Sequence, residues 1–141
     1  RPPAGYREFL AELAGNPAKH NVFRNDLPFD PEVCFYLDYR ADAEGWAHSM
    51  QVLPEGGADY VGHRPEQLPK VVRWIANNGD QGAMGLALPA TAEPDGYTAE
   101  KAKGNVRTLA PGETTRIELR AGALAPEEAV RTAEAIRQIL S

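Results

Sequence analysis

Residues 32–40 read EVCFYLDYR, and their side chains alternate between apolar and more polar types with a period of two. Successive side chains of an extended strand point to opposite faces, so this period predicts one apolar face and one face that becomes more polar toward Arg40. The apolar positions are Val33, Phe35, Leu37 and Tyr39. Because the backbone of a strand must hydrogen-bond to neighbouring strands, the stretch requires a β-sheet.

Other parts of the chain have the same short-strand character and are separated by turns rich in glycine and proline. Strands are expected at residues 47–53, 58–61, 68–76, 85–88 and 114–121. The intervening turns include PEGG, NNGDQG and LAPGE, whose residues favour turn conformations. Many short strands and few helices predict a mainly β fold, an antiparallel β-sandwich or part of one.

Short helices are expected near the N- and C-terminal ends of the sequence, at residues 6–14 and 126–140. The first has apolar side chains at helical spacing and is followed by Gly15 and Pro17, which end helices. The second begins with Pro126, a residue that suits the first helical position. Its predicted apolar stripe consists of Ala129, Ala133, Ile136 and Leu140.

The composition limits the class of protein and its partners. With 141 residues, of which 43% are hydrophobic and 25% charged, the sequence is typical of one globular domain covering residues 1–141. The net charge of −5 includes no basic block, so nucleic acid is not an expected partner. No apolar run approaches the ~20 residues that span a bilayer, so no membrane partner is expected either.

Cys34 is the only cysteine of the chain and cannot form an internal disulfide. This usage predicts a reducing environment and hence a cytoplasmic location. The neighbours of Cys34 are Val33 and Phe35, so we expect a small core residue here rather than a nucleophile.

Several kinds of catalytic or cofactor site lack the residues that they need. The histidines are His20, His48 and His63, and no two of them stand at metal-ligand spacing, so neither a metal nor another cofactor is expected. The chain has no glycine-rich phosphate loop and no G-x-S-x-G motif. What remains is carboxylate, histidine and aromatic chemistry, which suits proton transfer to and from the hydroxyl groups of sugars.

Four residues in and around the first strands are candidates for contacts to a sugar. Trp46, in the turn EGWAH, is expected to be exposed and to stack on a pyranose ring, with core packing as the equal alternative. His48 has either a polar structural role or a role as sugar contact and acid, and His63 lies either on the surface or in the site. Arg40, beside Asp38, forms either a solvated pair or, in a cleft, a contact to hydroxyls or a carboxylate.

Residues 85–105, GLALPATAEPDGYTAEKAKGN, begin like a buried strand and end in a cluster of charge. The charged residues are Glu93, Asp95, Glu100, Lys101 and Lys103. We interpret this loop as the rim of a sugar-binding site, where Glu93 and Asp95 meet the ligand and Lys101 binds an anionic sugar. The alternative for the lysines is a solvated cap on one helical turn.

Two stretches, LPKVVRWIANNGDQGAMGLALPATAEPDGY and RTLAPGETTRIELRAG, together resemble the C-terminal part of the aldose 1-epimerase (galactose mutarotase) family. The family's order is an aromatic-rich strand, an apolar strand, a Pro-Asp motif and an LxPGE turn before the last long strand. The corresponding pieces are residues 71–75, residues 85–88, Pro94 with Asp95, and residues 109–121. The resemblance covers roughly residues 66–122.

The resemblance implies a mutarotase-like β-supersandwich and the binding of a free sugar. It also implies a mechanism in which a glutamate takes the proton of the anomeric hydroxyl while a histidine protonates the ring oxygen, without a metal or organic cofactor. The family's glutamate position aligns with Pro89, so the nearest carboxylate, Glu93, takes the role of base, and His48 takes the role of acid.

Members of the family are longer than this chain and carry an N-terminal half that has no match here. The resemblance therefore implies that the chain is the C-terminal part of a longer β-sandwich protein. It further implies a partner, either a second copy in a homo-oligomer or the missing N-terminal half.

Three functions remain open from the sequence. The first is an enzyme that interconverts the α and β anomers of a free or anionic sugar. The second is a non-catalytic carbohydrate-binding module with the same sandwich, which Pro89 at the base position favours. The third is a structural piece that completes a sandwich, whose exposed edge strands would need a partner.

Overall fold

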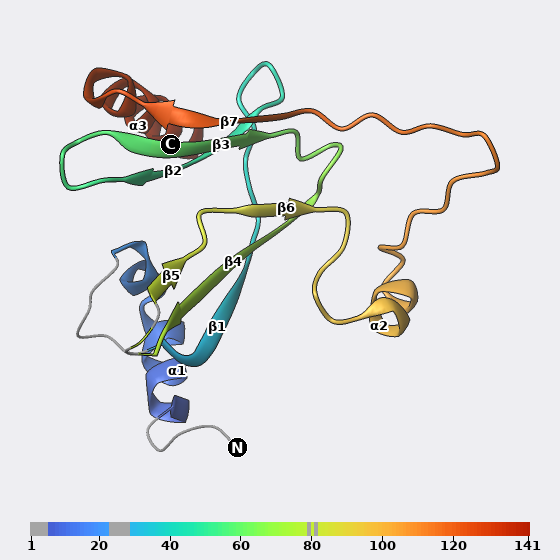
Figure 1. Ribbon diagram of the computed structural model, residues 1–141, viewed down its shortest axis with the longest axis horizontal. Helices are drawn as coiled ribbons and strands as arrows, with labels where there is room; N and C mark the ends of the chain where they lie inside the picture. The colour runs from blue at the N-terminus through green and yellow to red at the C-terminus, as the bar shows by residue number, and fades with distance from the viewer. Residues whose placement is uncertain (1–5, 23–28, 79, 81) are drawn as a thin grey trace. The chain divides into compact units, whose positions relative to one another are not determined.

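The computed structural model describes residues 6–22, 29–78, 80 and 82–141, and it contains two antiparallel sheets with a few helices (Figure 1). The prediction of a mainly β protein with helices near its two ends is therefore confirmed. The chain divides into two compact units, one formed by Arg1–Phe35 with Trp74–Gly85 and the other by Tyr36–Arg73 with Leu86–Ser141. Each unit is described by itself below.

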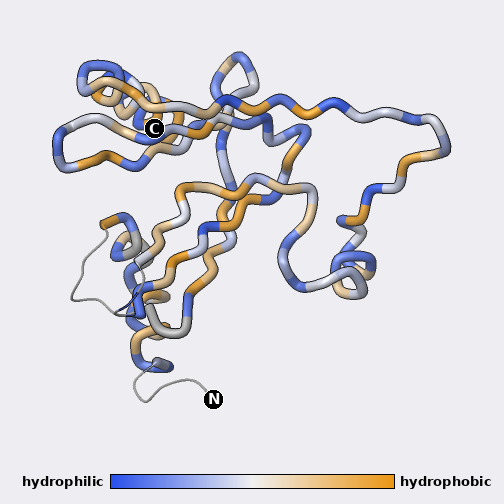
Figure 2. The backbone as a smooth tube through the Cα atoms, viewed as in Figure 1, coloured by the Kyte–Doolittle hydropathy of each residue, from blue (hydrophilic) through white to orange (hydrophobic). Residues whose placement is uncertain are grey.

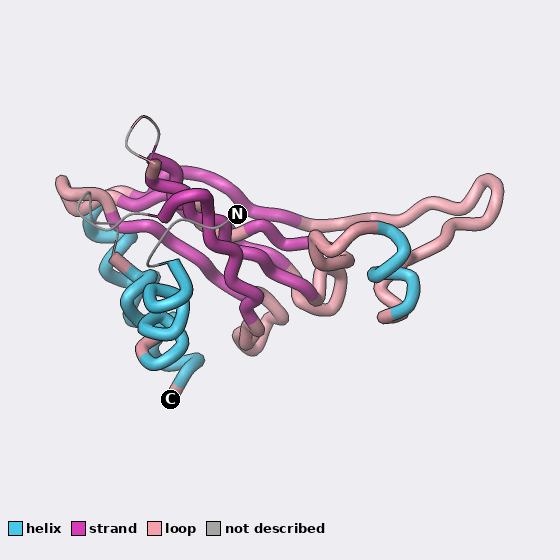
Figure 3. Tube along the Cα trace, turned by 90° about the horizontal axis from the view of Figure 1, so that it is seen from below, coloured by secondary structure: helices cyan, strands magenta, loops and turns pink. Residues whose placement is uncertain are grey.

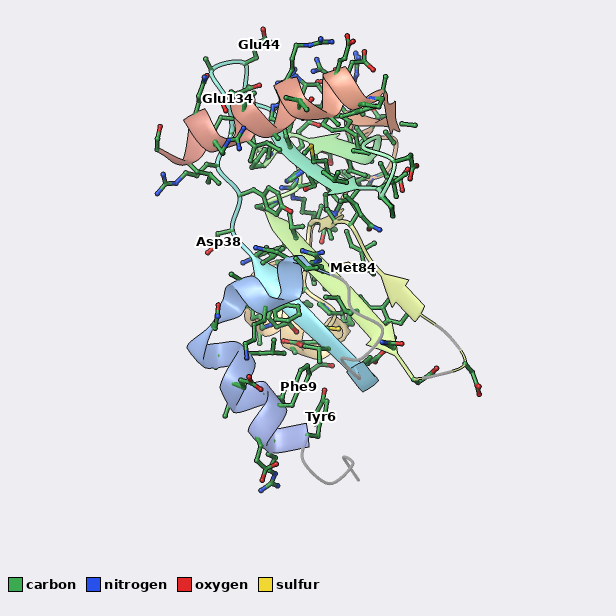
Figure 4. All side chains as sticks on the ribbon, turned by 90° about the vertical axis from the view of Figure 1, so that its left-hand side faces the viewer. Tyr6, Phe9, Asp38, Glu44, Met84 and Glu134 are labelled. Carbon is green, nitrogen blue, oxygen red and sulfur yellow. The ribbon has the colours of Figure 1, made fainter. Side chains whose placement is uncertain are left out.

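The first unit contains a small hydrophobic core beneath an amphipathic helix. Its elements are α1 (Tyr6–Gly15), the 3-10 turn η1 (Pro17–Asn21), most of β1 (Phe29–Leu37), the end of β4 (Lys70–Asn77) and β5 (Gly82–Met84). Leu13, Val33 and Ile75 form the buried centre of this core. Tyr6, Phe9, Phe35 and Met84 pack around it, three of which are labelled in Figure 4. The helix at residues 6–14 is thus confirmed.

Cys34 lies outside this core, so its predicted role as a core residue is wrong. Its thiol is exposed, whereas Val33 is 6% exposed, because consecutive side chains of β1 point to opposite faces of the sheet. The pKa of the Cys34 thiol is raised, first by partial desolvation and then by the nearby charge of Glu32. A raised pKa keeps the thiol protonated and unreactive.

The first sheet has the strand order β1–β4–β5, and the short strand β6 (Leu88–Ala90) also pairs with β4. Ile75 pairs with Met84 and Val72 pairs with Leu88, so three residues on one strand oppose two on β4. This mismatch is a β-bulge. It explains why the expected strand at residues 85–88 is wrong in its bounds: residues 85–87 form the bulge and join β5 to β6.

Gly85 is required at this bulge. Its N–H donates to the Trp74 carbonyl oxygen at 2.7 Å, and a Cβ added at Gly85 would lie 2.7 Å from that same oxygen. Any larger residue would push the two backbone segments apart.

The second sheet belongs to the second unit and has the order β2–β3–β7. Its strands are β2 (Ala47–Val52), β3 (Ala58–His63) and β7 (Leu119–Leu124). A hairpin joins the first two, with Val52 opposite Ala58 and Gly56 at a φ of +92° in the connection. Glycine is needed there because L side chains rarely adopt that φ. The strands predicted at residues 47–53 and 58–61 are confirmed.

The third strand of this sheet differs from the predicted strand at residues 114–121. β7 begins only at Leu119, where it pairs with His63, and it ends at Leu124 beside Ala58. Residues 114–118 have strand-like alternation but form loop, because a periodic sequence specifies a face and not a pairing partner. Figure 2 shows alternating hydrophobic and hydrophilic colours along this segment before β7.

The C-terminal helix α3 (Pro126–Leu140) packs against β2 and β7 (Figure 4). Its start is fixed locally, because the Glu128 carboxylate accepts a hydrogen bond from the Ala125 N–H at 3.0 Å. Ala129 is buried, as predicted, but Leu140 is 60% exposed. The predicted stripe is therefore wrong at its end, where Ile139 is the less exposed side chain.

The charged loop after β6 contains a short helix, α2 (Tyr97–Ala102), with loop on both sides of it (Figure 3). Lys101 lies in this helix and Lys103 at its C-cap, which agrees with the predicted single helical turn. Within the described residues, no helix is both long and apolar enough to cross a membrane. The predicted turn NNGDQG includes Gly79 and Gln81, which lie outside the described residues.

Candidate functional site

A tight turn before β2 holds the carboxylate of Asp42 in a fixed position. One oxygen, Oδ1, accepts backbone hydrogen bonds from the N–H groups of Glu44 and Trp46, each at 2.9 Å. The Asp42 N–H in turn donates to the Trp46 carbonyl at 2.8 Å, and Gly45 adopts a φ of +80°. Aspartate commonly closes turns in this way. The second oxygen, Oδ2, is left to contact a side chain.

That side chain is His48 of β2, whose Nε2 lies 2.9 Å from Asp42 Oδ2. The other ring nitrogen, Nδ1, lies 2.7 Å from the phenol oxygen of Tyr60 on β3. His48 is directly opposite Gly62 in the register, so Tyr60 reaches it along the diagonal of the sheet. The three side chains form a continuous chain of hydrogen bonds from carboxylate to imidazole to phenol.

Gly62 makes this diagonal contact possible. A Cβ added at Gly62 would lie 2.6 Å from the Tyr60 phenol oxygen, closer than real side chains approach. The phenol ring therefore lies over a position where the sheet has no side chain.

The hydrogen-bond partners of His48 indicate which of its ring nitrogens carries a proton. An ionised carboxylate can only accept hydrogen bonds, so Nε2 of His48 carries the proton that faces Asp42. In the neutral imidazole, Nδ1 then accepts, and the Tyr60 hydroxyl donates to it. His48 is thus placed to remove a proton from Tyr60, and Asp42 is placed to stabilise the imidazolium that forms.

The surroundings change the pKa values of the two outer groups. The pKa of Asp42 is lowered, first by the backbone hydrogen bond from Trp46 and then by its hydrogen bond with His48. The pKa of Tyr60 is raised because partial burial disfavours the phenolate, although the nearby charge of Arg120 acts in the opposite direction.

Trp46 is buried, so its expected exposure as a platform for a sugar is wrong. It is 5% exposed, and two guanidinium groups lie over its indole ring. Those of Arg64 and Arg120 are 4.3 Å and 3.8 Å from the ring centroid. Such cation–π contacts cover the aromatic faces that a sugar would need.

His63, at the end of β3, is completely buried, which excludes the expected surface position. Its ring meets Tyr39 edge-on, with 5.3 Å between the ring centroids. Among the described residues, neither ring nitrogen of His63 has a hydrogen-bond partner. Burial and the nearby charge of His48 both lower the pKa of His63, so the imidazole is neutral.

The charged loop forms a second cluster, centred on the ammonium group of Lys103. This group bonds Glu93 at 2.7 Å, Glu100 at 3.0 Å and also Asp95. Lys70 adds a second cation to Glu93 at 3.5 Å. The cluster therefore neutralises most of its own charge.

The side chains around Lys103 shift the pKa values within this cluster. Three carboxylates raise the pKa of Lys103, with Asp95 the largest contributor. The pKa of Asp95 falls because of Lys103 and then the Tyr36 hydroxyl, which donates at 2.9 Å. The pKa of Glu100 falls chiefly through the amide of Asn105, despite the burial of this carboxylate.

The same three carboxylates are close enough together to be considered as metal ligands. Of the described residues, only the oxygens of Glu93, Asp95 and Glu100 form such a group, all within 4.8 Å of one another. Hard cations favour such oxygens. However, the Lys103 ammonium contacts all three carboxylates, so a cation would compete directly with it.

The two remaining predicted residues contact groups outside both clusters. Arg40 is exposed, and its guanidinium donates to the Leu140 carbonyl at 3.4 Å, at the end of α3. Lys101 is also exposed, and its ammonium lies 5.9 Å from the centroid of the Tyr97 ring. These contacts are of a kind found at helix C-termini and on solvated surfaces.

The predicted site residues therefore fall into separate sets. His48 and Trp46 lie near each other at the start of β2, whereas Glu93 and Asp95 share Lys103. The partners of His48 and those of Glu93 are different residues, so the structure does not bring the expected base and acid into one hydrogen-bonded pair.

Sequence reasoning missed four residues, Asp42, Tyr60, Gly62 and Arg120. One signal was available for Asp42 and one for Tyr60. The turn ADAEG offers an aspartate before a strand, and pairing the strands at residues 47–53 and 58–61 as a hairpin places Tyr60 on the same face as His48. Arg120 could not be placed, because its strand pairs across a long separation in sequence.

No protein family, no curated protein and no solved structure matches this chain.

Proposed function

We propose that this chain catalyses proton transfer at a sugar hydroxyl, in the manner of an aldose 1-epimerase that interconverts α and β anomers. The observation that supports the proposal is the chain of hydrogen bonds from Asp42 through His48 to Tyr60. Its members lie on adjacent strands and a tight turn, so their geometry is fixed before a ligand binds. General acid–base catalysis uses side chains that are positioned in this way to accept and donate protons.

In the proposed reaction, the anomeric hydroxyl gives its proton to the Tyr60 oxygen while the Tyr60 proton passes to His48 Nδ1. The C1–O bond to the ring oxygen breaks, the aldehyde forms, and a water molecule gives a proton to the ring oxygen, leaving a hydroxide that recovers this proton on ring closure. The aldehyde rotates, and closure from either face reverses each proton transfer. Asp42 stabilises the imidazolium throughout.

These roles differ from those implied by the family resemblance, in which His48 is the acid and Glu93 the base. The position of His48 Nδ1, 2.7 Å from the Tyr60 hydroxyl while Nε2 faces the Asp42 carboxylate, supports the role of base. The Glu93 carboxylate is engaged by Lys103 and Lys70, so its oxygens already have partners within the protein.

The second candidate function is a non-catalytic carbohydrate-binding module. The ion pairs of Glu93, together with Pro89 of β6 at the family's base position, favour this function. It predicts sugar binding without any acceleration of anomer exchange.

We propose also that the two sheets belong to a mutarotase-like supersandwich that a second chain or a second copy completes. The support is the exposure of apolar side chains on the segment that leads into β7 and at its first residue, namely Leu109, Ile117 and Leu119. β7 is an edge of its sheet, and exposed edge strands favour pairing with another chain.

The test of the catalytic proposal is exchange NMR of the anomers of glucose and galactose with the wild-type chain and with Tyr60→Phe. The proposal expects acceleration by the wild type that Tyr60→Phe removes while sugar binding persists. Binding without acceleration in the wild type would support the non-catalytic module instead. The absence of both would overturn the two candidate functions.

A further inference from the structure

We propose that the site beside Tyr60 takes a sugar that carries a carboxylate or phosphate group, and that Arg120 binds this anion. The inference rests on the proposed function, since it names the substrate class of the same site. The observations that support it concern Arg120, its contacts and its neighbours.

The side chain of Arg120 lies on the same face of the sheet as those of His48 and Tyr60. It stands on β7 directly opposite Gly62, which is opposite His48 on β2. The side chain of Tyr60 lies over Gly62, where an added Cβ would lie 2.6 Å from the phenol oxygen and 3.4 Å from the Cβ of Arg120, so the two side chains are neighbours. A group bound to this guanidinium is therefore adjacent to the phenol oxygen.

Arg64 is paired with a carboxylate, whereas Arg120 is not. Arg64 donates to the Glu118 carboxylate at 2.8 Å and to the Glu44 carbonyl at 2.9 Å. Across the part of the chain that the structure describes, no carboxylate lies within ion-pair distance of Arg120, which is an exposed residue. Its guanidinium therefore keeps donors for an external anion.

Trp46 holds the Arg120 guanidinium in place. The group lies 3.8 Å from the centroid of the buried indole, so it has less rotational freedom than a solvated arginine. A planar guanidinium binds carboxylate and phosphate through two parallel hydrogen bonds, and pre-organisation lowers the entropy lost on binding.

A neutral sugar would not use this charge. Its hydroxyl groups would displace water from the guanidinium without neutralising it, whereas an anion gains a charge-assisted hydrogen bond. The net charge of the chain is −5, so long-range attraction does not bring anions to its surface in general. Binding of an anion must then depend on a local group such as Arg120.

The experiment follows the indole of Trp46 by NMR while inorganic phosphate, glucuronate or glucose is added to the full chain. The indole reports on Arg120 directly, and the readout does not require catalysis. Arg120→Gln removes the charge, and Arg120→Lys keeps a charge without the planar group. Arg116→Gln is the matched control, because the Arg116 side chain is 86% exposed and its guanidinium pairs with Glu118 at 3.2 Å.

We expect phosphate and glucuronate to shift the Trp46 signal in the wild type and in Arg116→Gln. Arg120→Gln is expected to weaken this binding by ~10-fold or more, and Arg120→Lys by less, because charge-assisted bidentate bonds are lost. Circular dichroism establishes that each variant is folded. Equal affinities in the wild type and Arg120→Gln, or no shift by any anion, would overturn the inference.

The failure of this inference and that of the proposed function can be told apart. Anion binding that depends on Arg120, with no exchange of any sugar anomer, would leave the anion site standing and overturn the catalytic function. If the protein accelerated the anomer exchange of glucose and glucuronate equally, and Arg120→Gln had no effect, the catalytic function would stand and the anion site would be overturned.

Discussion

The second unit contains two groups of titratable side chains. One group consists of ion pairs, whereas the other is a series of hydrogen bonds. Around Lys103, three carboxylates share one ammonium and Lys70 adds a second cation, so most of the charge is neutralised within the cluster. Along Asp42, His48 and Tyr60, a single carboxylate is bound to an imidazole, which is bound to a phenol. The ion pairs of the first group favour fixed protonation states, whereas the second group could pass a proton from Tyr60 to His48.

The difference shows why a dense cluster of charge is a poor guide to a catalytic site. The loop of residues 85–105 attracts attention because it contains so many ionisable groups, yet its contacts stabilise the charged forms of Asp95, Glu100 and Lys103. A proton relay needs acceptors and donors of alternating type, and His48 between Asp42 and Tyr60 supplies them.

The largest expected effect is on catalysis. Tyr60→Phe removes the phenol at the end of the relay and His48→Gln removes its base, so each is expected to lower the rate of anomer exchange by ~100-fold or more. Glu93→Gln is expected to lower it far less, because Glu93 is engaged by lysines. Exchange NMR measures all three rates. If Glu93→Gln lost the acceleration of anomer exchange and Tyr60→Phe kept it, the loop cluster and not the relay would be the catalytic site.

The next effect is on stability. Lys103→Met leaves three neighbouring carboxylates without their common cation, and Glu100 among them is only 3% exposed. We expect a lower thermal unfolding midpoint, because like charges then repel and a buried charge loses its partner. Lys101→Met is the matched control, since Lys101 is exposed and lies 5.9 Å from the Tyr97 ring centroid. Equal midpoints for the two variants would show that the cluster contributes nothing measurable.

A smaller effect is expected when the phenol is displaced but not removed. Gly62→Ala places a Cβ 2.6 Å from the Tyr60 oxygen, so the ring must move away from His48. We expect exchange to slow by ~10-fold, because a small misplacement weakens proton transfer. Gly122→Ala on β7 is the control, since an added Cβ there meets no atom within 4 Å. Similar rates in both variants would mean that the position of Tyr60 is unimportant.

The smallest effect is a pH dependence that arises outside both clusters. The pKa of His63 is lowered in the folded state, mainly by burial and secondly by His48, so the unfolded chain binds the proton more tightly. The contribution to stability is complete above the unfolded value of about 6.5 and is lost as the pH falls below it. His63→Phe is expected to flatten the difference in unfolding free energy between pH 7.5 and 5.5.

Urea unfolding of the wild type and His63→Phe at these two pH values measures the difference. The carboxylates act in a different range: the lowered pKa of Asp42 gives stability that is present above about 4 and lost as the pH falls further. An unchanged slope between pH 7.5 and 5.5 in His63→Phe would assign the titration to another group.

Local regularity could be predicted from the sequence because it depends on neighbours along the chain. The period of two at residues 32–40 indicates a strand, and β1 buries Val33 while half-burying Phe35. The strands at residues 47–53 and 58–61 and the helix at residues 126–140 are found close to their predicted bounds. Turn residues and helix spacing act over a few residues, so they need no knowledge of the rest of the fold.

Register and burial were decided only by the tertiary structure. The bounds of β7 depend on its pairing with β3, from which it is separated by more than fifty residues. The exposure of Cys34 depends on which face of β1 meets the core, and the burial of Trp46 depends on two arginines, one from β7 and one beyond β3. None of these partners is a neighbour in sequence.

The candidate site divides in the same way. The sequence by itself determined that His48 is a polar residue on a strand, with an aspartate in the turn before it. Only the hairpin register places Tyr60 diagonal to His48, over a glycine that leaves room for the phenol. The reason is physical: the relay requires contacts of about 3 Å, and the contact between His48 and Tyr60 forms between two strands, whose register the local sequence does not specify.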